Sequence, residues 1–176
     1  MARWVGGYCT AQICQNGHVI VSGAETAPDF KADYCKDCGA STTMECAACK
    51  EAIRGRYDSG AIGLDNYTAP RFCHRCGAAY PWTAAKLEAA KELADELDEL
   101  TADERERLKG TLDDLVKDSP RTQVAGTRFK RLMIKAGTSG ASAMREIMVD
   151  VLSEATKKMI IGSAKERAGS RPPHPT

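Results

Sequence analysis

The pattern of hydrophobic and polar positions changes once along the chain, near Thr83. Before this point, apolar residues occur in short runs that glycine and polar residues separate. After it, apolar residues recur every three or four positions, which is the period of an amphipathic helix. The pattern predicts a small α+β protein with short β-hairpins in residues 1–82, a helical domain in residues 83–168 and a disordered tail in residues 169–176.

The first part carries strand and turn signals. Residues 3–13 are rich in β-forming side chains and are expected to be a strand. Asn16-Gly17 precedes the apolar run Val19–Val21, and this dipeptide predicts a type I′ hairpin turn. Residues 22–34 and 54–71 are rich in Gly, Asp and Pro, so we expect loops there.

About four helices are expected after the change of pattern. Thr83 is the predicted N-cap of the first, and Thr101 with Glu104 forms a capping box for the second. The third is predicted over about 123–136 and the fourth over about 141–167, because Ser119-Pro120 and Gly137–Gly140 interrupt the pattern. The inward-facing residues are Leu87, Ala90, Leu93, Ala94, Leu97 and Leu100 in the first helix, Leu108, Leu112, Leu115 and Val116 in the second, Val124, Phe129, Leu132 and Met133 in the third, and Met144, Ile147, Met148, Val151, Leu152, Ala155, Met159 and Ile160 in the fourth.

The apolar stripe of the fourth helix is long and rich in methionine. Such a stripe is most often core, although methionine also adapts to varied protein partners. The second helix offers only four large apolar residues to cover it. We therefore expect part of the stripe to stay uncovered in a monomer and to make a contact beyond the chain.

The segment from Cys14 to Cys76 contains little apolar material but seven of the 8 cysteines. Zn²⁺ takes four Cys or His ligands in a tetrahedral shell, and two residues between ligands let one tight turn present both. The segment holds four half-sites, three of them Cys-x2-Cys and one Cys-x3-His, so two Zn²⁺ ions per chain are expected. The predicted ligands are Cys14, His18, Cys35, Cys38, Cys46, Cys49, Cys73 and Cys76.

An internal repeat favours one way of pairing the half-sites. The segments 34–40 and 72–78 both read aromatic-Cys-x-x-Cys-Gly-Ala, and another ligand pair precedes each. Two zinc ribbons in series are therefore favoured. The alternative is a cross-braced arrangement, in which the first half-site pairs with the third and the second with the fourth. Gly39 and Gly77 suit a turn with positive φ after the second cysteine.

The fourth ligand of the first ribbon is either His18 or Cys9. His18 is favoured because it sits on the knuckle itself, in the three-Cys, one-His combination that structural zinc tolerates. Cys9 is then a small buried residue. His74 lies inside a knuckle whose sulfurs already supply two ligands, so it is expected to face solvent, and His174 falls in the predicted tail.

Composition and charge bear on the partners of the chain and on its cellular compartment. The formal net charge is +1, which points to no partner. Residues 4–24 lack charged side chains, but polar residues and glycine interrupt them, so no apolar core of signal-peptide or membrane-spanning length is present. We expect a cytoplasmic protein, and in that compartment three C-x-x-C pairs favour metal over disulfides.

Charge is segregated in the helical part. Residues 83–118 hold twelve acidic and six basic side chains, and residues 119–176 hold eleven basic and four acidic ones. Attraction between the two segments, within one fold or one oligomer, is the simpler interpretation. Nucleic-acid contact is the alternative, through the third helix or through the second ribbon, where Arg beside Tyr57 and Tyr67 can stack on bases. The candidate contacts are Arg54, Arg56, Arg71, Arg75, Arg128, Lys130, Arg131 and Lys135.

No set of nucleophile, base and acid emerges from the sequence. The run Gly137–Gly140 before a helix lacks the lysine of a phosphate-binding loop. A zinc ion with four protein ligands has no open position for catalysis. We therefore expect a non-enzymatic protein-interaction module or scaffold that binds a protein partner or a second copy through its helical part, with a nucleic-acid-binding zinc-ribbon protein as the alternative.

Once these residues are placed, the whole chain resembles a family of bacterial zinc-ribbon proteins of unknown function. The resemblance implies zinc ribbons followed by helices and brings no activity. Lys50 departs from the pattern, since a ribbon knuckle more usually has glycine there. The matching stretches are residues 13–20, the two aromatic-Cys-x-x-Cys-Gly pieces, Tyr80-Pro81-Trp82-Thr83, residues 119–122 and residues 127–131.

Overall fold

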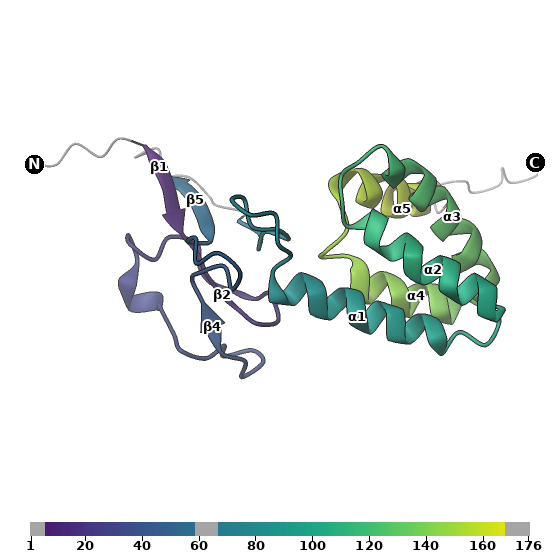
Figure 1. Cartoon of the computed structure of the whole chain (residues 1–176), viewed down its shortest axis with the longest axis horizontal. Coiled ribbons are helices and arrows are strands. Elements are labelled where there is room, and N and C mark those ends of the chain that lie inside the picture. Colours follow the sequence, from purple (N-terminus) through teal and green to yellow (C-terminus); the bar gives the residue numbers. More distant parts are fainter. Residues whose placement is uncertain (1–5, 59–66, 168–176) are drawn as a thin grey trace, which may run out of the picture. The chain divides into compact units, whose positions relative to one another are not determined.

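The computed structural model describes residues 6–58 and 67–167, and their side chains as far as Ile160 (Figure 1). The chain divides into two compact units, Met1–Ala85 and Lys86–Thr176, and the division falls inside helix α1 (Pro81–Asp95). The fold is a small α+β one, with short antiparallel strands in the first unit and helices in the second. Residues 3–5, the expected tail 169–176 and His174 lie outside the described residues.

Two small sheets form the first unit. Strand β1 (Gly7–Thr10) pairs antiparallel with β5 (Arg54–Asp58), and Figure 1 shows the two side by side. Strand β2 (Gln12–Cys14) lies between β3 (Val19–Val21) and β4 (Thr42–Thr43) in a second antiparallel sheet. A 3₁₀ turn, η1, covers Pro28–Phe30.

The expectation of one strand over residues 3–13 is wrong. The chain changes partner at Ala11, whose N–H donates to Ile53 O at 2.8 Å, so that β1 and β2 belong to different sheets. The hairpin predicted from Asn16-Gly17 is confirmed, because β2 and β3 pair across it, but the predicted type I′ turn is wrong: that turn needs positive φ at both central residues, and Gly17 is the only turn residue that has it. Gly17 has φ +90°, and its N–H donates to Cys14 O at 2.9 Å, which closes the turn.

The expected loop 54–71 is also wrong at its start, because Arg54–Asp58 is strand β5. Gly55 makes this pairing possible, since a Cβ there would lie 2.1 Å from Ser22 O. Residues 59–66 of that loop lie outside the described residues. The core of the unit is small and includes two cysteines. Its buried members are Ala11, Ile13, Cys46, Ile53, Cys73, Tyr80 and Trp82.

The second unit packs its helices around α3 (Arg121–Lys135), which contacts α2 (Ala102–Leu115), α4 (Gly137–Met148) and α5 (Glu154–Arg167). None of the helices in the described ranges has the length and apolar character needed to cross a bilayer. The leucines expected to face inward from α2 are fully buried, as is Val116.

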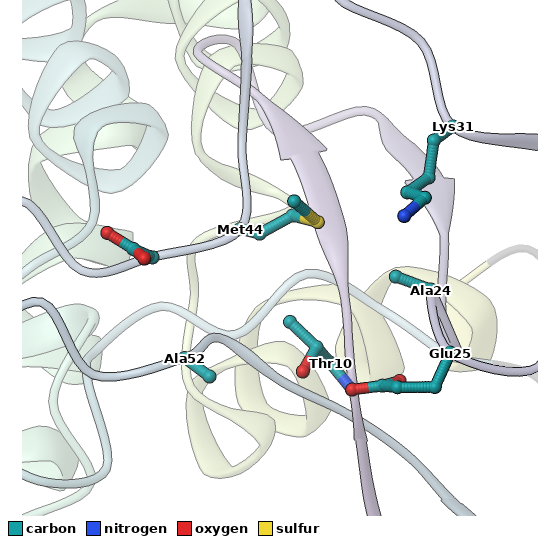
Figure 2. A pocket seen from close by; sticks show the side chains of 7 residues that line it. Thr10, Ala24, Glu25, Lys31, Met44 and Ala52 are labelled. Atoms are coloured by element: carbon teal, nitrogen blue, oxygen red, sulfur yellow. The ribbon is translucent and has the colours of Figure 1, made fainter. Parts of the chain in front are cut away.

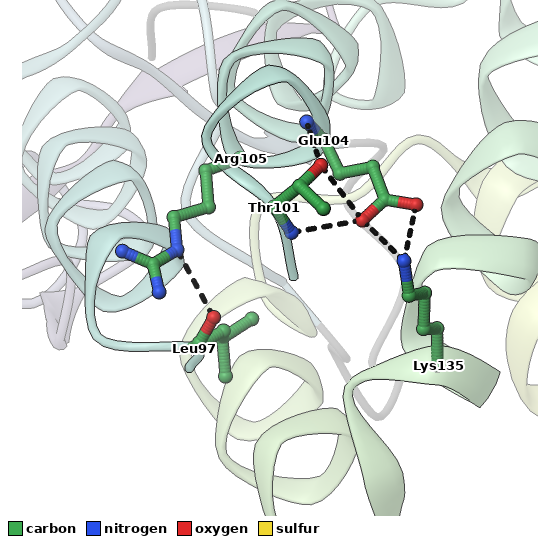
Figure 3. A network of polar contacts seen from close by, with 5 residues as sticks. All are labelled: Leu97, Thr101, Glu104, Arg105 and Lys135. Carbon is green, nitrogen blue, oxygen red and sulfur yellow. Dashed lines mark hydrogen bonds and ion pairs between the residues drawn. The ribbon is translucent and has the colours of Figure 1, made fainter. Parts of the chain in front are cut away.

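The capping box of α2 is confirmed (Figure 3). The Thr101 N–H donates to Glu104 Oε2 at 2.9 Å, and the Glu104 N–H donates to Thr101 Oγ1 at 3.4 Å. The Glu104 carboxylate also pairs with Lys135 of α3, at 2.6 Å. Thr83 is not the N-cap of α1. The helix begins at Pro81, and the buried Thr83 hydroxyl donates to Arg71 O at 3.0 Å.

The single fourth helix predicted over 141–167 is wrong, because α4 begins at Gly137 and ends at Met148. Ser153 then starts α5: its N–H donates to Leu115 O at 3.1 Å, and its hydroxyl accepts from the Thr156 N–H at 3.2 Å. The end of α2 therefore anchors the start of α5, and the chain must bend to reach it.

The methionine-rich stripe is covered within the unit. Met144, Met148, Val151 and Leu152 are all fully buried, so the expectation that this face stays uncovered is wrong for these residues. The break between α4 and α5 explains the difference, because two short helices can fold around α3 where one long helix cannot. Val124, expected in the core, is instead 60% exposed, on the face of α3 opposite Phe129.

Candidate metal centres

Cys14, His18, Cys35 and Cys38 form the first group of side chains that can hold a metal ion. Their ligand atoms all lie within 4.8 Å of one another. Nδ1 of His18 is 3.6 Å from Cys14 Sγ and 3.5 Å from Cys35 Sγ, and the sulfurs of Cys14 and Cys38 are 3.8 Å apart. The structure thus brings His18, and not the buried Cys9 of β1, to this group.

Cys46, Cys49, Cys73 and Cys76 form the second group, by the same 4.8 Å criterion. The sulfurs of Cys46 and Cys76 are 3.8 Å apart, and those of Cys49 and Cys73 are 3.7 Å apart. The half-sites are therefore grouped in series, the first with the second and the third with the fourth, as the internal repeat indicates. The two groups that this spacing defines can each hold one metal ion.

The three Cys-x-x-Cys knuckles share one backbone geometry. In each, the residue after the second cysteine donates its N–H to the carbonyl of the first: Gly39 to Cys35 at 2.8 Å, Lys50 to Cys46 at 2.9 Å and Gly77 to Cys73 at 2.9 Å. The donor residue has positive φ in all three, with values of 71°, 61° and 73°. Lys50 therefore takes the conformation that glycine takes elsewhere, and the knuckle at Cys49 keeps its shape.

A short bridge closes each knuckle on its outer side. Tyr34 pairs with Ser41, Glu45 with Ala52 and Phe72 with Ala79, each antiparallel. The first cysteine of each knuckle is buried: Cys35, Cys46 and Cys73. Cys38 and Cys76 are exposed, and Cys49 is half-buried. Each centre thus has ligands anchored in the unit and ligands presented at its surface.

Local hydrogen bonds spread the thiol pKa values apart. The backbone N–H of Ala40 and the side chain of Asn16 lower the pKa of Cys38 to about 6. Backbone N–H groups of Cys76 and Arg75 lower the pKa of Cys73 to about 6 despite burial. The backbone N–H of Glu51 lowers the pKa of Cys49, but burial and three neighbouring sulfurs outweigh it and raise the value to about 12. Sulfurs this close cannot all ionise without a cation among them.

The candidate nucleic-acid contacts are divided between the two units, and several of them already have partners within their own unit. Arg54 stacks over Tyr8, with its Cζ 4.4 Å from the ring centroid. Arg56 donates to Thr26 Oγ1 at 2.9 Å, and Arg75 forms an ion pair with Glu51. Arg71 is half-buried. The remaining candidates are on α3, where Lys135 pairs with Glu104, Lys130 is half-buried, and Arg128 and Arg131 are exposed.

Sequence reasoning missed a hollow of about 310 Å³ in the first unit (Figure 2). Glu25 is one of two acidic residues that line it. Both carboxylate oxygens accept the Thr10 N–H, at 3.0 and 2.9 Å, and these bonds keep the Glu25 pKa low although burial opposes them. The carboxylate is therefore engaged by the backbone. The hollow is lined by Thr10, Ala24, Glu25, Lys31, Met44, Glu45 and Ala52.

The model of one protein family matches the chain. The family is described as an uncharacterised protein conserved in bacteria (DUF2321), and the match covers residues 7–160. It includes both groups of metal-binding side chains and all five helices that the structure describes, the last in part. No curated protein and no solved structure matched the chain.

Proposed function

Because the chain belongs to a bacterial family of uncharacterised proteins, which supplies no activity, we propose from the geometry that both centres hold structural Zn²⁺ and that the zinc-bound chain acts as a protein-interaction module. The proposal of structural Zn²⁺ is carried by one observation: in each of two groups, four thiol or imidazole ligand atoms lie within 4.8 Å of one another. Thiolates and imidazoles in groups of four suit tetrahedral Zn²⁺.

Metal content tests the choice and number of ions. Protein purified without added metal is expected to contain about two Zn per chain by elemental analysis, since there are two groups of four ligands. Cys38→Ser and Cys76→Ser should each reduce the content by about one ion, each leaving the other centre loaded. One ion per chain in the unchanged protein, or iron in place of zinc, would refute this part of the proposal.

The proposal assigns no catalytic role to either centre. Four protein ligands saturate a tetrahedral ion and leave no position for a substrate or an activated water. In the hollow, the Glu25 carboxylate accepts the backbone N–H of Thr10, and this bond makes it a weaker base. Both considerations support a structural role for the metal, which fixes a surface that other molecules recognise.

The exposed face of α3 is the part of the second unit that best fits a protein partner. Arg128 and Arg131 form no ion pair in the described part of the chain, and with Val124 and Thr127 they line a shallow groove of about 330 Å³. Val124 is 60% exposed and Ile134 is 77% exposed. Unpaired cations beside exposed apolar side chains favour a protein segment with acidic and apolar residues over a bare phosphate backbone.

A photo-crosslinking amino acid at position 124 tests this surface in the native host. The expected result is a covalent protein adduct that Arg128→Glu and Arg131→Glu together abolish. The matched control is the same amino acid in place of Gly110, which is exposed on α2 and where an added Cβ meets nothing within 4 Å. Equal adducts from both positions, or an adduct that nuclease removes, would contradict a protein-binding face on α3.

A nucleic-acid-binding protein remains the second candidate, and one observation favours it. Tyr8 and Tyr57 pair across β1 and β5 with ring centroids 5.3 Å apart, are 59% and 55% exposed, and lie beside Arg54. Exposed aromatic rings with arginine can stack on unpaired bases. Retention on single-stranded DNA that falls steeply with salt, and that Tyr57→Ala weakens, would support this candidate.

A further inference from the structure

Tyr80 carries a buried hydroxyl without a hydrogen-bond partner in the described part of the chain. The residue is 1% exposed, and its Oη is one of two buried side-chain atoms there that lack a partner. The other is Nη1 of Arg71. Both atoms carry hydrogen and can donate it. In the sequence, Arg71 lies before the knuckle Cys73–Cys76 and Tyr80 lies after it. Buried polar groups in folded proteins nearly always have a partner, so an acceptor is expected close to this knuckle.

The position of the Tyr80 ring is fixed on several sides. Its backbone N–H donates to Arg71 O at 3.0 Å, beside the bridge between Phe72 and Ala79. The ring stacks on Trp82, with centroids 4.7 Å apart and planes 14° apart, and Trp82 Nε1 donates to Pro70 O at 2.8 Å. Tyr80 therefore cannot turn its hydroxyl out to water without breaking this packing.

Tyr80 belongs to the same buried cluster as Cys46 and Cys73, two members of the second metal centre. A tyrosine hydroxyl is protonated at neutral pH and can therefore donate a hydrogen bond. A centre of four thiolates and one divalent ion carries a net charge of about −2, which makes its sulfurs acceptors of charge-assisted hydrogen bonds.

We propose that Tyr80 belongs to the second metal centre as a positioning residue, with its hydroxyl donating a hydrogen bond to Cys73 Sγ once the four sulfurs bind an ion. This inference rests on the proposed metal binding at that centre. The hydrogen bond withdraws charge from the Cys73 thiolate. It therefore lowers the reactivity of that sulfur towards electrophiles and slows loss of the ion. Partners of this kind typically change metal affinity by about 10- to 100-fold.

Tyr80→Phe, which removes only the hydroxyl, tests the proposal in the full chain loaded with Co²⁺. Loss of the hydrogen bond should move the thiolate-to-Co²⁺ charge-transfer absorption to lower energy, because an unbonded thiolate gives up its electrons more easily. Zinc affinity at the second centre should fall by about tenfold, and alkylation read by mass spectrometry should reach Cys73 sooner. The first centre, followed through Cys38, should be unchanged.

Tyr67→Phe is the matched control. Tyr67 packs against the same cluster, but its hydroxyl donates to Arg54 O at 2.7 Å, so its loss should leave the charge-transfer absorption in place. Identical spectra and zinc affinities for the two variants and the unchanged protein would overturn the proposal. Absence of any thiolate-to-Co²⁺ absorption from the second centre would overturn the proposed metal binding as well. This result therefore distinguishes a failure of metal binding from a failure of the Tyr80 hydrogen bond alone.

A measurement on the unchanged protein covers the case in which Tyr80→Phe does not fold. With a spin-half cadmium isotope in the second centre, the Tyr80 hydroxyl proton should show scalar coupling to the metal through Cys73 Sγ. A buried, hydrogen-bonded hydroxyl exchanges slowly enough with water for its proton to be observed. Coupling to cadmium would support the proposal. A Tyr80 hydroxyl proton that is observed without such coupling would overturn it.

Discussion

Lys50 holds a backbone conformation that suits glycine, and its replacement by glycine should tighten the second metal centre. Its φ is 61°, whereas Gly39 and Gly77 occupy the equivalent positions of the other two knuckles with φ 71° and 73°. A side chain in this left-handed region costs about 1–2 kcal/mol. Glycine loses more chain entropy on folding, which costs about 0.5–1 kcal/mol. Lys50→Gly should therefore stabilise the folded, metal-bound knuckle by about 0.5–1 kcal/mol.

The reverse change should cost a similar amount at Gly77. A Cβ built on Gly39 or Gly77 meets no other atom within 4 Å, so steric contact adds nothing and the penalty is conformational. At about 1.4 kcal/mol per tenfold, Lys50→Gly should tighten zinc binding at the second centre about two- to fivefold, and Gly77→Lys should weaken it by about the same factor. Competition with a chromophoric chelator measures both affinities, and alkylation of the released cysteines identifies the centre.

Two controls separate conformation from charge and from the general effect of glycine. Lys50→Ala removes the positive charge near the anionic centre but keeps a Cβ at positive φ, so it should not reproduce the gain. Gly110→Ala places a Cβ in open space on helix α2, where alanine is favoured, and should raise helical stability by about 1 kcal/mol. Weaker zinc binding in Lys50→Gly, or an equal gain in Lys50→Ala, would refute the assignment of strain to Lys50.

Four further predictions concern the two units. Thr101→Ala removes the cap of α2 and should lower the free energy of unfolding of the helices by about 1 kcal/mol in urea titrations followed by helical circular dichroism. Lys135 and the Thr101 N–H lower the pKa of Glu104 from its ordinary value of 4.5 to about 2, so the stabilisation that Glu104 provides is complete above pH 4.5 and is lost as pH falls towards 2. The stability difference between the unchanged protein and Glu104→Gln should therefore shrink across that interval, and a constant difference would contradict this pairing. Met148→Glu puts a charge at a fully buried position, so it should cost helicity and cause aggregation, whereas a folded variant of smaller size would restore the oligomer interpretation. Strong chelation should unfold the first unit and leave most helical circular dichroism, and parallel loss of both signals would show a single cooperative unit.

Residue type and spacing were enough to indicate the metal centres. Ligand identity, the series grouping of the half-sites and the capping box of α2 all depend on residues close together in sequence or on an internal repeat. All three Cys-x-x-Cys turns of this chain form the same knuckle, because the hydrogen bond from the residue after the second cysteine to the carbonyl of the first is local. For the same reason, the positive φ expected at Gly39 and Gly77 could be predicted before any tertiary contact was known.

Tertiary contacts decided the features that the sequence analysis got wrong. Ser153 is a local signal for the start of α5, because its hydroxyl accepts the Thr156 N–H, but the sequence analysis did not use it. Where the chain bends to is decided by the bonds of Ser153 and Thr156 to Leu115 O, which lies 41 residues from Thr156 at the end of another helix. Likewise, β5 tolerates only glycine at position 55, where the backbone passes close to Ser22 O. Thr83 bonds Arg71 O rather than capping its own helix. The unpartnered hydroxyl of Tyr80 became visible only when the fold enclosed it beside Cys73, since burial is a property of the packed chain and not of the residue.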